Sequence, residues 1–253
     1  MSEVRTAPRG FEGLIKRERY PHTWCPGCGI GLIFNNIIRV LSEKGLDYSN
    51  TAAISGIGCS GRMAGYMNMD SVHTPHGRAL PVAEAIKLVN PDLNVIVASG
   101  DGDLASIGGN HLLHTSRRNP DITVFCVNNE TYGLTGGQLA PTTPKGVRTI
   151  TSLNGALHNP LSMQKIVTGN AQYFYARSTV YHLDHMRECM HAALEWPGFA
   201  FVEVISDCIE LHGRRLGFKT PHEMIATYGE KYVLAPAGRT ELAPNELGIM
   251  TKA

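Results

Sequence analysis

The segment from Leu93 to Ala98 is an almost continuous apolar run that ends at Ser99-Gly100-Asp101-Gly102. Such a run is typical of a parallel strand that is buried on both faces. A helical pattern over 104–118 and a β-branched run over 122–127 follow it and complete one βαβ unit. The same alternation predicts further helices over 32–44, 80–89, 161–167 and 182–195, and strands over 51–55, 173–176 and 199–205. We therefore expect an α/β fold, with a mostly parallel sheet and helices on both faces.

The chain of 253 residues shows no internal repeat, and we expect residues 1–253 to form a single domain. Three segments lack a clear period. They are an N-terminal cysteine loop over about 20–31, a glycine-rich loop over 131–159 and a tail over about 234–253. A loop as long as the second is functional or disordered. The tail is expected to be irregular and to lie along a partner or move freely.

Charge and hydropathy exclude several classes of function. The 23 Lys and Arg balance 22 Asp and Glu, which favours neither nucleic acid nor an anionic membrane surface as a partner. No apolar stretch reaches the roughly 18 residues of a membrane span, and residues 1–20 lack the apolar centre of a signal peptide. We therefore expect a soluble protein of the cytoplasm. Its six cysteines then favour metal binding, catalysis or packing over disulfides.

Polar side chains follow two neighbouring strands of the predicted sheet. Asp101 ends the first strand, and Asn129 ends the next strand along the chain. The carboxyl ends of adjacent parallel strands lie side by side, so these two residues can converge. Their oxygens, with the carbonyl of Thr131, suit an octahedral Mg²⁺ that also holds phosphate oxygens. The helix that begins near Asp103 aims its N-terminal amides at the same place, which favours a diphosphate. Alternatively, Asp101 only caps this helix.

Gly100-Asp101-Gly102 followed by Asn128-Asn129 resembles the motif of thiamine diphosphate enzymes. Further segments narrow the resemblance to the β subunits of 2-oxoacid:ferredoxin oxidoreductases, and most closely to the 2-oxoglutarate branch. They are Trp24-Cys25-Pro26-Gly27-Cys28-Gly29, Gly56-Ile57-Gly58-Cys59-Ser60-Gly61-Arg62, His76-Gly77-Arg78 and Tyr132-Gly133-Leu134-Thr135-Gly136-Gly137-Gln138. The resemblance extends over roughly residues 20–219. It implies a thiamine diphosphate-binding fold.

The resemblance also implies a set of cofactor-binding residues. Asp101, Asn129 and the Thr131 carbonyl would bind Mg²⁺, and Leu134 would pack near the thiazolium ring. His76 belongs to the loop that contacts the cofactor in the family, although a histidine there can also simply order the following helix. The thiamine diphosphate contacts carried over are Ile57, Gly58, Cys59, Ser60, His76, Gly77, Gly100, Asp101, Gly102, Asp103, Asn129, Leu134 and Thr135.

The cysteines admit more than one interpretation. Taken alone, Cys25-Pro26-Gly27-Cys28 could be a redox pair or half of a zinc site. Four thiolates can also hold an iron–sulfur cluster. The family resemblance implies a 4Fe-4S cluster on Cys25, Cys28, Cys59 and Cys208, which leaves zinc as the alternative. We expect Cys126 to be a buried small residue. Cys189 and His185 are four residues apart on one predicted helix, but no further ligand stands near them in sequence.

Arg62 is the candidate for the substrate, because a guanidinium binds a carboxylate bidentately. It follows the cluster ligand Cys59 by three residues and is expected to point between cluster and cofactor. Solvation, or a pair with Asp70, is the alternative. By resemblance, the acid is 2-oxoglutarate, with branched-chain acids or pyruvate as alternatives. Two candidates come from other classes of protein. One is half of a non-redox thiamine diphosphate decarboxylase or synthase, and the other is an iron–sulfur electron carrier.

Partners follow from the same resemblance. The resemblance implies oxidative decarboxylation of a 2-oxoacid, which needs coenzyme A and ferredoxin as well as the acid. Thiamine diphosphate also needs a glutamate that forms a hydrogen bond with its aminopyrimidine ring. Neither Glu84 nor Glu130 is a candidate, because both stand in motifs of the diphosphate half. Relatives carry that glutamate on the α subunit. We therefore expect an obligate αβ pair, with (αβ)2 as the assembly, and an isolated chain without activity.

Overall fold

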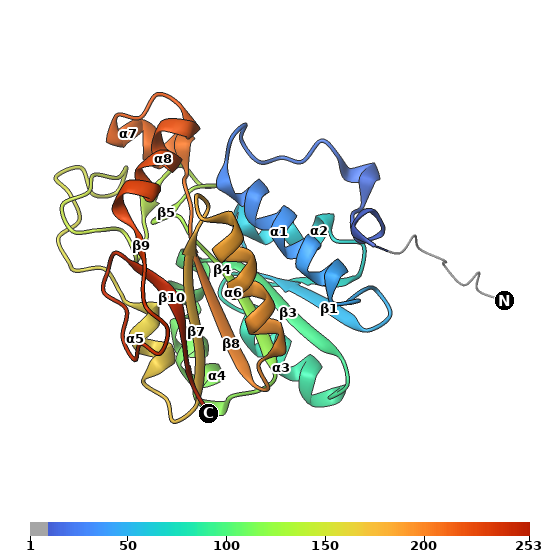
Figure 1. Cartoon of the computed structure of the whole chain (residues 1–253). Coiled ribbons are helices and arrows are strands. Elements are labelled where there is room, and N and C mark those ends of the chain that lie inside the picture. Colours follow the sequence, from blue (N-terminus) through green and yellow to red (C-terminus); the bar gives the residue numbers. More distant parts are fainter. Residues whose placement is uncertain (1–9) are drawn as a thin grey trace.

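The computed structural model describes residues 10–253, so residues 1–9, where the expected single domain begins, lie outside the described part. One eight-stranded sheet, in the order β2-β1-β3-β4-β8-β7-β10-β9, runs through the molecule (Figure 1). Its strands are parallel except at β7 and β10, which pair antiparallel. They are β1 (Thr51–Ser55), β2 (Asp70–His73), β3 (Asn94–Gly100), β4 (Ile122–Asn128), β7 (Tyr173–Thr179), β8 (Phe199–Ile205), β9 (Val233–Leu234) and β10 (Glu246–Lys252). A separate hairpin joins β5 (Thr131–Tyr132) and β6 (Gln138–Leu139).

Helices cover both faces of the sheet. On one face α1 (Gly29–Glu43), α2 (Met63–Tyr66), α6 (Leu183–Glu195) and α8 (Pro221–Lys231) contribute to one apolar core. On the other face α3 (Ala79–Val89), α4 (Gly109–Arg118) and α5 (Met163–Thr168) contribute to a second. Shorter helical elements complete the chain: η1 (Phe11–Leu14), η2 (Arg17–Arg19), η3 (Ser60–Arg62), the π-helices η4 (Asp103–Ile107) and η5 (Ile209–Gly213), and α7 (Arg214–Leu216).

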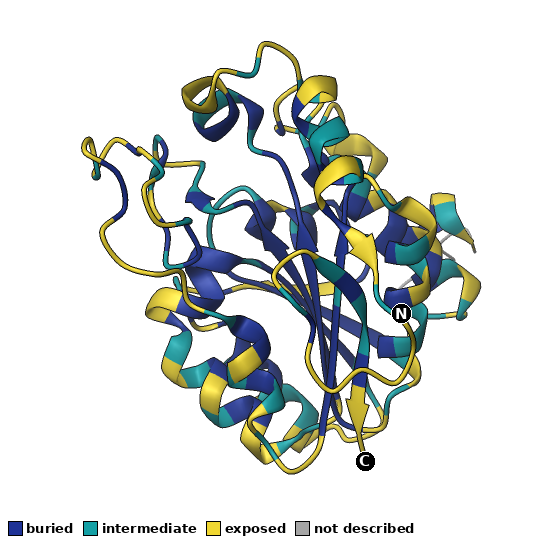
Figure 2. Cartoon of the chain, turned by 60° about the vertical axis from the view of Figure 1, so that its left-hand side comes forward, coloured by how far each residue is buried: buried dark blue, intermediate teal, exposed yellow. Residues whose placement is uncertain are grey.

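Successive side chains of the central strands point alternately into these two cores. Phe125 on β4 packs into the core of α1 and α6, whereas its neighbour Val124 packs into the core of α3, α4 and α5. Because both faces are covered, every residue of β4 and β8 is buried. Figure 2 shows this as a dark sheet between helices whose outer sides are exposed. The predicted α/β class, with a mostly parallel sheet, is therefore confirmed.

Most predicted element boundaries lie within three residues of the observed ones, but the helix predicted over 104–118 is divided. Residues Asp103–Ile107 form a π-helix, and α4 begins only at Gly109. The amide of Gly108 donates to the carbonyl of Asp103 at 3.0 Å, five residues back. A Cβ at Gly108 would lie 2.5 Å from that oxygen, so glycine permits the wide turn. π-turns of this kind are frequent at functional sites.

The expectation of an irregular tail over about 234–253 is wrong for its last part. Residues 235–245 have no helix or strand, but β10 pairs with β7 on one side and β9 on the other. The buried side chains of β10 are Leu247 and Met250, three residues apart. The strand therefore lacks the two-residue alternation that would have revealed it. Its stability comes from the sheet edge that it covers.

Helix α8 was also missed, although the sequence carries its signal. Thr220 and Glu223 form a reciprocal capping box, and Pro221 occupies the first turn. The expected long loop over 131–159 contains the β5–β6 hairpin, followed by a segment without helix or strand. No helix within residues 10–253 combines the length and apolar character needed to cross a membrane.

Candidate active site

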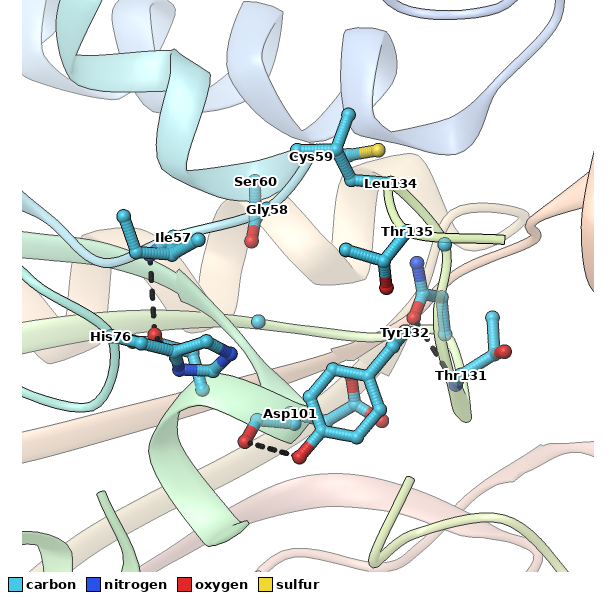
Figure 3. A pocket seen from close by; sticks show the side chains of 15 residues that line it. Ile57, Gly58, Cys59, Ser60, His76, Asp101, Thr131, Tyr132, Leu134 and Thr135 are labelled. Carbon is cyan, nitrogen blue, oxygen red and sulfur yellow. Dashed lines mark hydrogen bonds and ion pairs between the residues drawn. The ribbon is translucent and has the colours of Figure 1, made fainter. Parts of the chain in front are cut away.

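A pocket lies where β1, β3 and β4 end, at the carboxyl edge of the sheet. It measures about 550 Å³, counting the part open to solvent. Three chain segments form its wall, one after each of these strands, together with one histidine (Figure 3). The lining residues are Ile57, Gly58, Cys59, Ser60, His76, Gly100, Asp101, Gly102, Asp103, Asn129, Thr131, Tyr132, Gly133, Leu134 and Thr135.

This wall brings together all the predicted cofactor and magnesium residues except Gly77. Gly77 lies behind it, where its amide donates to Asp103 Oδ1 at 2.8 Å. The wall also contains Tyr132 and Gly133, which were not predicted. Both stand directly before Leu134 in the sequence motif, so the motif itself could have identified them. Tyr132 closes the floor by donating its hydroxyl to the carbonyl of Gly102 at 3.1 Å.

Asp101 lies at the bottom of the pocket and is only 2% exposed. The hydroxyl of Thr142 donates a hydrogen bond to its carboxylate. Burial, with a smaller contribution from the nearby Glu130 carboxylate, raises the pKa of Asp101 to about 7. A buried carboxylate in this position is stabilised by a cation. Thr142 lies outside every motif, and no local sequence signal connects it with Asp101.

Two further oxygen donors stand beside Asp101. Asn129 is buried, and its Oδ1 accepts from the amide of Thr131 at 3.4 Å. Thr131 is buried as well, and its hydroxyl donates to the carbonyl of Gln138 at 3.0 Å. Carboxylate, amide and carbonyl oxygens are the ligands that Mg²⁺ prefers. The donor set therefore fits the predicted ion.

Asp103 holds the pocket loops together. Its Oδ1 accepts from the amides of Ile57 at 3.2 Å and Gly77 at 2.8 Å, and its Oδ2 accepts from the hydroxyl of Ser99 at 2.7 Å. His76 Nδ1 lies 2.7 Å from the same carboxylate. Two loops and the end of β3 thus converge on one buried side chain. The carboxylate is engaged within the protein, so it supports the wall of the pocket.

The four cysteines predicted as cluster ligands lie at one side of this pocket. Cys25 is exposed, and Cys28, Cys59 and Cys208 are partly buried. Burial, with a smaller contribution from the nearby Cys208 thiol, raises the pKa of Cys28 to about 12 and that of Cys59 to about 11. These thiols become good ligands only when a metal replaces the proton. Cys59 also lines the pocket, so the two sites share a wall.

Gly133 lies in the wall of the pocket, close to Cys59 and Cys208. A Cβ at this position would lie 3.2 Å from Cys208 Sγ and 3.9 Å from Cys59 Sγ. A larger residue would therefore press on Cys208 Sγ. The glycine allows the backbone after β5 to approach the cysteine set closely.

Two hydrogen bonds join the segments that carry the cysteines. The indole N–H of Trp24 donates to the carbonyl of Cys59 at 2.8 Å. The amide of Gly29, in the first turn of α1, donates to Asp207 Oδ1 at 2.8 Å. Burial raises the pKa of Asp207 to about 6. Asp207 directly precedes Cys208, so this hydrogen bond connects the Cys208 segment with the turn that follows Cys28. No motif indicated this role.

Replacing Asp207 by alanine leaves the buried Gly29 amide without an acceptor, a loss of about 1–3 kcal/mol that is partly offset at neutral pH because burial raises the pKa of Asp207. We also expect a lower iron content in the purified protein. Asp207→Asn keeps an acceptor oxygen and should retain more iron than the alanine variant. Thermal unfolding and iron analysis measure both effects. Equal iron in wild type and Asp207→Ala would contradict this role.

No three His, Cys, Asp or Glu side chains within residues 10–253 converge closely enough to bind one metal ion. Cys189 Sγ lies 3.7 Å from His185 Nε2, one turn apart on α6, and this contact is confined to the helix. Cys126 is fully buried in β4, where its thiol donates to Met163 Sδ at 3.7 Å. Neither cysteine belongs to the set beside the pocket.

Arg62 lies outside the pocket. It is exposed and lines a neighbouring hollow with Arg19, Tyr66 and His73. No ion pair joins it to Asp70 among the described side chains. Its charge lowers the pKa of the Cys59 thiol, although burial outweighs this effect. A contact between Arg62 and a substrate carboxylate stays a prediction.

The described residues that line the pocket include no glutamate. Glu84 is paired with Arg118 at 2.7 Å on the surface of α3. The Glu130 carboxylate lies 3.6 Å from His212 Nε2. Neither Glu84 nor Glu130 lines the pocket, so neither takes the role of the aminopyrimidine-binding glutamate that we expect on the α subunit.

Comparison with known proteins agrees with this geometry. Residues 56–204 match the family described as thiamine pyrophosphate enzyme, C-terminal TPP binding domain. The chain is 45% identical, over 83% of its length and 74% of the relative, to 2-oxoglutarate synthase subunit KorB of Methanothermobacter thermautotrophicus. It is 42% identical, over 73% of its length and 50% of the relative, to 2-oxoglutarate oxidoreductase subunit KorB of Mycobacterium tuberculosis.

A solved structure is similar over almost the whole chain. The 2-oxoglutarate:ferredoxin oxidoreductase of Magnetococcus marinus, with 2-oxoglutarate, coenzyme A and succinyl-CoA bound, matches 99% of this chain and 87% of its own. The TM-score is 0.85 at 31% identity. Fold and pocket thus define a thiamine pyrophosphate-binding enzyme domain. Within this class, the chain belongs to the β subunits of the 2-oxoacid:ferredoxin oxidoreductases.

Proposed function

We propose that this chain is the cofactor-binding β subunit of a 2-oxoglutarate:ferredoxin oxidoreductase. The enzyme would convert 2-oxoglutarate and coenzyme A to succinyl-CoA and CO2, or catalyse the reverse, and ferredoxin would carry the two electrons. One observation carries the proposal: the pocket with Asp101 and the set of four cysteines share Cys59 as a wall. Such an enzyme needs a site where the 2-oxoacid is decarboxylated and, beside it, a group that accepts the electrons. The names of its relatives support 2-oxoglutarate as the acid.

Each group of residues has a task in this reaction. Asp101, Asn129 and the Thr131 carbonyl would bind Mg²⁺ and, through it, the diphosphate of the cofactor. When bound, thiamine diphosphate supplies the nucleophilic carbon and the electron sink for decarboxylation. Leu134, half exposed where it lines the pocket (Figure 3), would exclude water from that carbon. Arg62 would bind the substrate carboxylate.

The cysteines would hold a 4Fe-4S cluster that accepts electrons singly. Their thiols influence one another's pKa values, yet they do not converge on one point as a zinc site requires. In an iron–sulfur cluster, by contrast, each cysteine thiolate binds a different iron. Gly133 would lie between such a cluster and the cofactor, since it lines the pocket and approaches Cys208 Sγ. The cluster would supply the acceptor for single electrons.

The α subunit would supply the glutamate that the pocket wall lacks. We therefore propose an obligate αβ unit, assembled as (αβ)2 in the cytoplasm, that acts on ferredoxin. The whole chain, from residue 1 to residue 253, would serve as one thiamine diphosphate-binding domain of this assembly. An isolated β chain would bind the diphosphate half of the cofactor and remain inactive.

Viologen reduction by the anaerobically purified αβ complex tests this function. We expect coenzyme A-dependent reduction with 2-oxoglutarate, and much slower reduction with pyruvate or 2-oxoisovalerate. A preference for either of those acids would keep the class but change the substrate. No reduction with any acid, in a complex shown to contain thiamine diphosphate, would favour a non-redox thiamine enzyme with a zinc-bound or empty cysteine site.

A further inference from the structure

A buried polar network lies behind the pocket and joins β4, β7 and β8. Asn128, the last residue of β4, is 6% exposed, and Glu203 on β8 is 4% exposed. Asn128 Nδ2 donates to Glu203 Oε1 at 2.6 Å. A carboxylate only accepts, so this contact determines which end of the Asn128 amide faces Glu203. Neither side chain lines the pocket.

The second oxygen of Glu203 is occupied by other donors. Arg177 Nε donates to Oε2 at 3.1 Å, and the hydroxyl of Tyr175 donates to the same oxygen. Arg177 is itself held, because its guanidinium donates to the carbonyl of Ala243 at 3.1 Å and to Gln164 Oε1 at 3.3 Å. The carboxylate of Glu203 is therefore fixed, with one oxygen left for Asn128.

The fixed amide of Asn128 acts on the turn that follows β4. With its nitrogen directed at Glu203, its Oδ1 accepts from the amide of Glu130 at 3.3 Å. Glu130 has a φ of 60°, a left-handed conformation that residues other than glycine adopt at a cost. The hydrogen bond stabilises this conformation. The turn at Glu130 lies between Asn129 and Thr131, two of the proposed Mg²⁺ ligands.

We propose that Glu203 is a positioning residue for the Mg²⁺–diphosphate site and acts through Asn128. The inference rests on the proposed function, since it concerns the ion that Asn129 and Thr131 would bind there. Glu203 fixes the Asn128 amide, the amide holds the left-handed turn at Glu130, and the turn aims two oxygen ligands toward Asp101. A network of this kind maintains ligand geometry before the ion arrives.

Glu203→Gln tests this relay with little change in size. Asn128, Arg177 and Tyr175 all donate hydrogen bonds to Glu203, but a glutamine has only one acceptor oxygen. Its NH2 group must therefore face either Asn128 or the pair of Arg177 and Tyr175, and the contact on that side is lost. We expect thiamine diphosphate to bind the αβ complex about tenfold more weakly, and more Mg²⁺ to be needed for half-saturation. Calorimetric titration of the cofactor-stripped complex measures both. Iron content should change little, whereas thermal stability should fall, because Arg177 loses its buried carboxylate partner.

Glu84→Gln is the matched control, because it also breaks a carboxylate–arginine pair, with Arg118, on the surface of α3. It should bind thiamine diphosphate and Mg²⁺ as the wild type does. The double variant Asn128→Ala/Glu203→Gln separates a relay from a general effect on the sheet. If Glu203 acts through Asn128, the double variant should bind no more weakly than Asn128→Ala alone.

Unchanged binding in Glu203→Gln, or additive losses in the double variant, would overturn the inference. If Glu203→Gln does not assemble, Asn128→Ala decides the question, because it leaves the Glu203–Arg177 pair intact. Wild-type affinity in Asn128→Ala would then overturn the relay. A wild-type complex that binds no thiamine diphosphate in the presence of Mg²⁺ would instead refute the proposed function.

Discussion

Asp101→Ala is expected to abolish the retention of thiamine diphosphate by the purified αβ complex. Asp101 is the carboxylate of the pocket that is free to bind an ion, because Asp103 accepts from two loop amides and the Ser99 hydroxyl. Loss of groups that only orient metal ligands costs about 10–100-fold in affinity, so loss of a charged ligand should cost at least about 100-fold. Extraction of the cofactor and its quantification after gel filtration measure the loss.

The variant should remain folded. Burial raises the pKa of Asp101, so its ionised form destabilises the cofactor-free protein as the pH rises from the ordinary value of 3.8 toward about 7. Alanine removes this cost, and we expect the thermal midpoint of the cofactor-free complex not to fall at neutral pH. Asp121→Ala is the control, since Asp121 is exposed and pairs only with Lys87 at 2.6 Å. Normal cofactor content in Asp101→Ala would refute the magnesium assignment.

Periodicity was enough to predict the centre of the fold. The strands β1, β3, β4 and β8 are buried on both faces, so their sequences are apolar runs that local patterns reveal. The edges were harder. Both β2, whose four residues are all exposed, and β10 depend on pairing with a neighbour, which leaves little trace in the sequence.

The candidate site divides in the same way. The convergence of Asp101 and Asn129 follows from the rule that parallel strands end at one edge, and the pocket contains both residues. The grouping of Cys25, Cys28 and Cys59 with Cys208 depended on the family resemblance, because the last of them lies far along the chain. Spacing alone left a redox pair and a zinc site open.

Supporting residues could not be predicted from the sequence. Thr142 bonds to Asp101 itself, and Asp207 and Glu203 bond to residues next to the site. Each of these hydrogen bonds spans at least 41 positions. Each is a common polar residue in an ordinary context. Only the folded chain shows that they orient Asp101, the turn after Cys28 and Asn128. Such contacts depend on tertiary packing, which short-range patterns do not encode.

Cys208→Ser is expected to lose the cluster and, with it, all viologen reduction. Serine has a hydroxyl whose proton is far harder to remove than that of a thiol, and iron in such clusters binds sulfur ligands. The amides of Leu211 and His212 lower the pKa of the Cys208 thiol, although burial raises it overall. These amides would favour the thiolate once iron is bound. Iron and acid-labile sulfide in the purified complex measure the loss.

Cys189→Ser is the matched control, because it makes the same change at a fully buried cysteine on α6 that contacts only His185 among the titratable side chains near it. It should keep normal iron and sulfide. Cys208→Ser should still retain thiamine diphosphate, since Cys208 does not line the pocket. Asp101→Ala should show the opposite pattern, with iron retained and cofactor lost. Normal iron and sulfide in Cys208→Ser would remove this residue from the ligand set. Loss of both cofactors in either variant would mean that the cluster site and the thiamine diphosphate site, which share Cys59, depend on each other for binding.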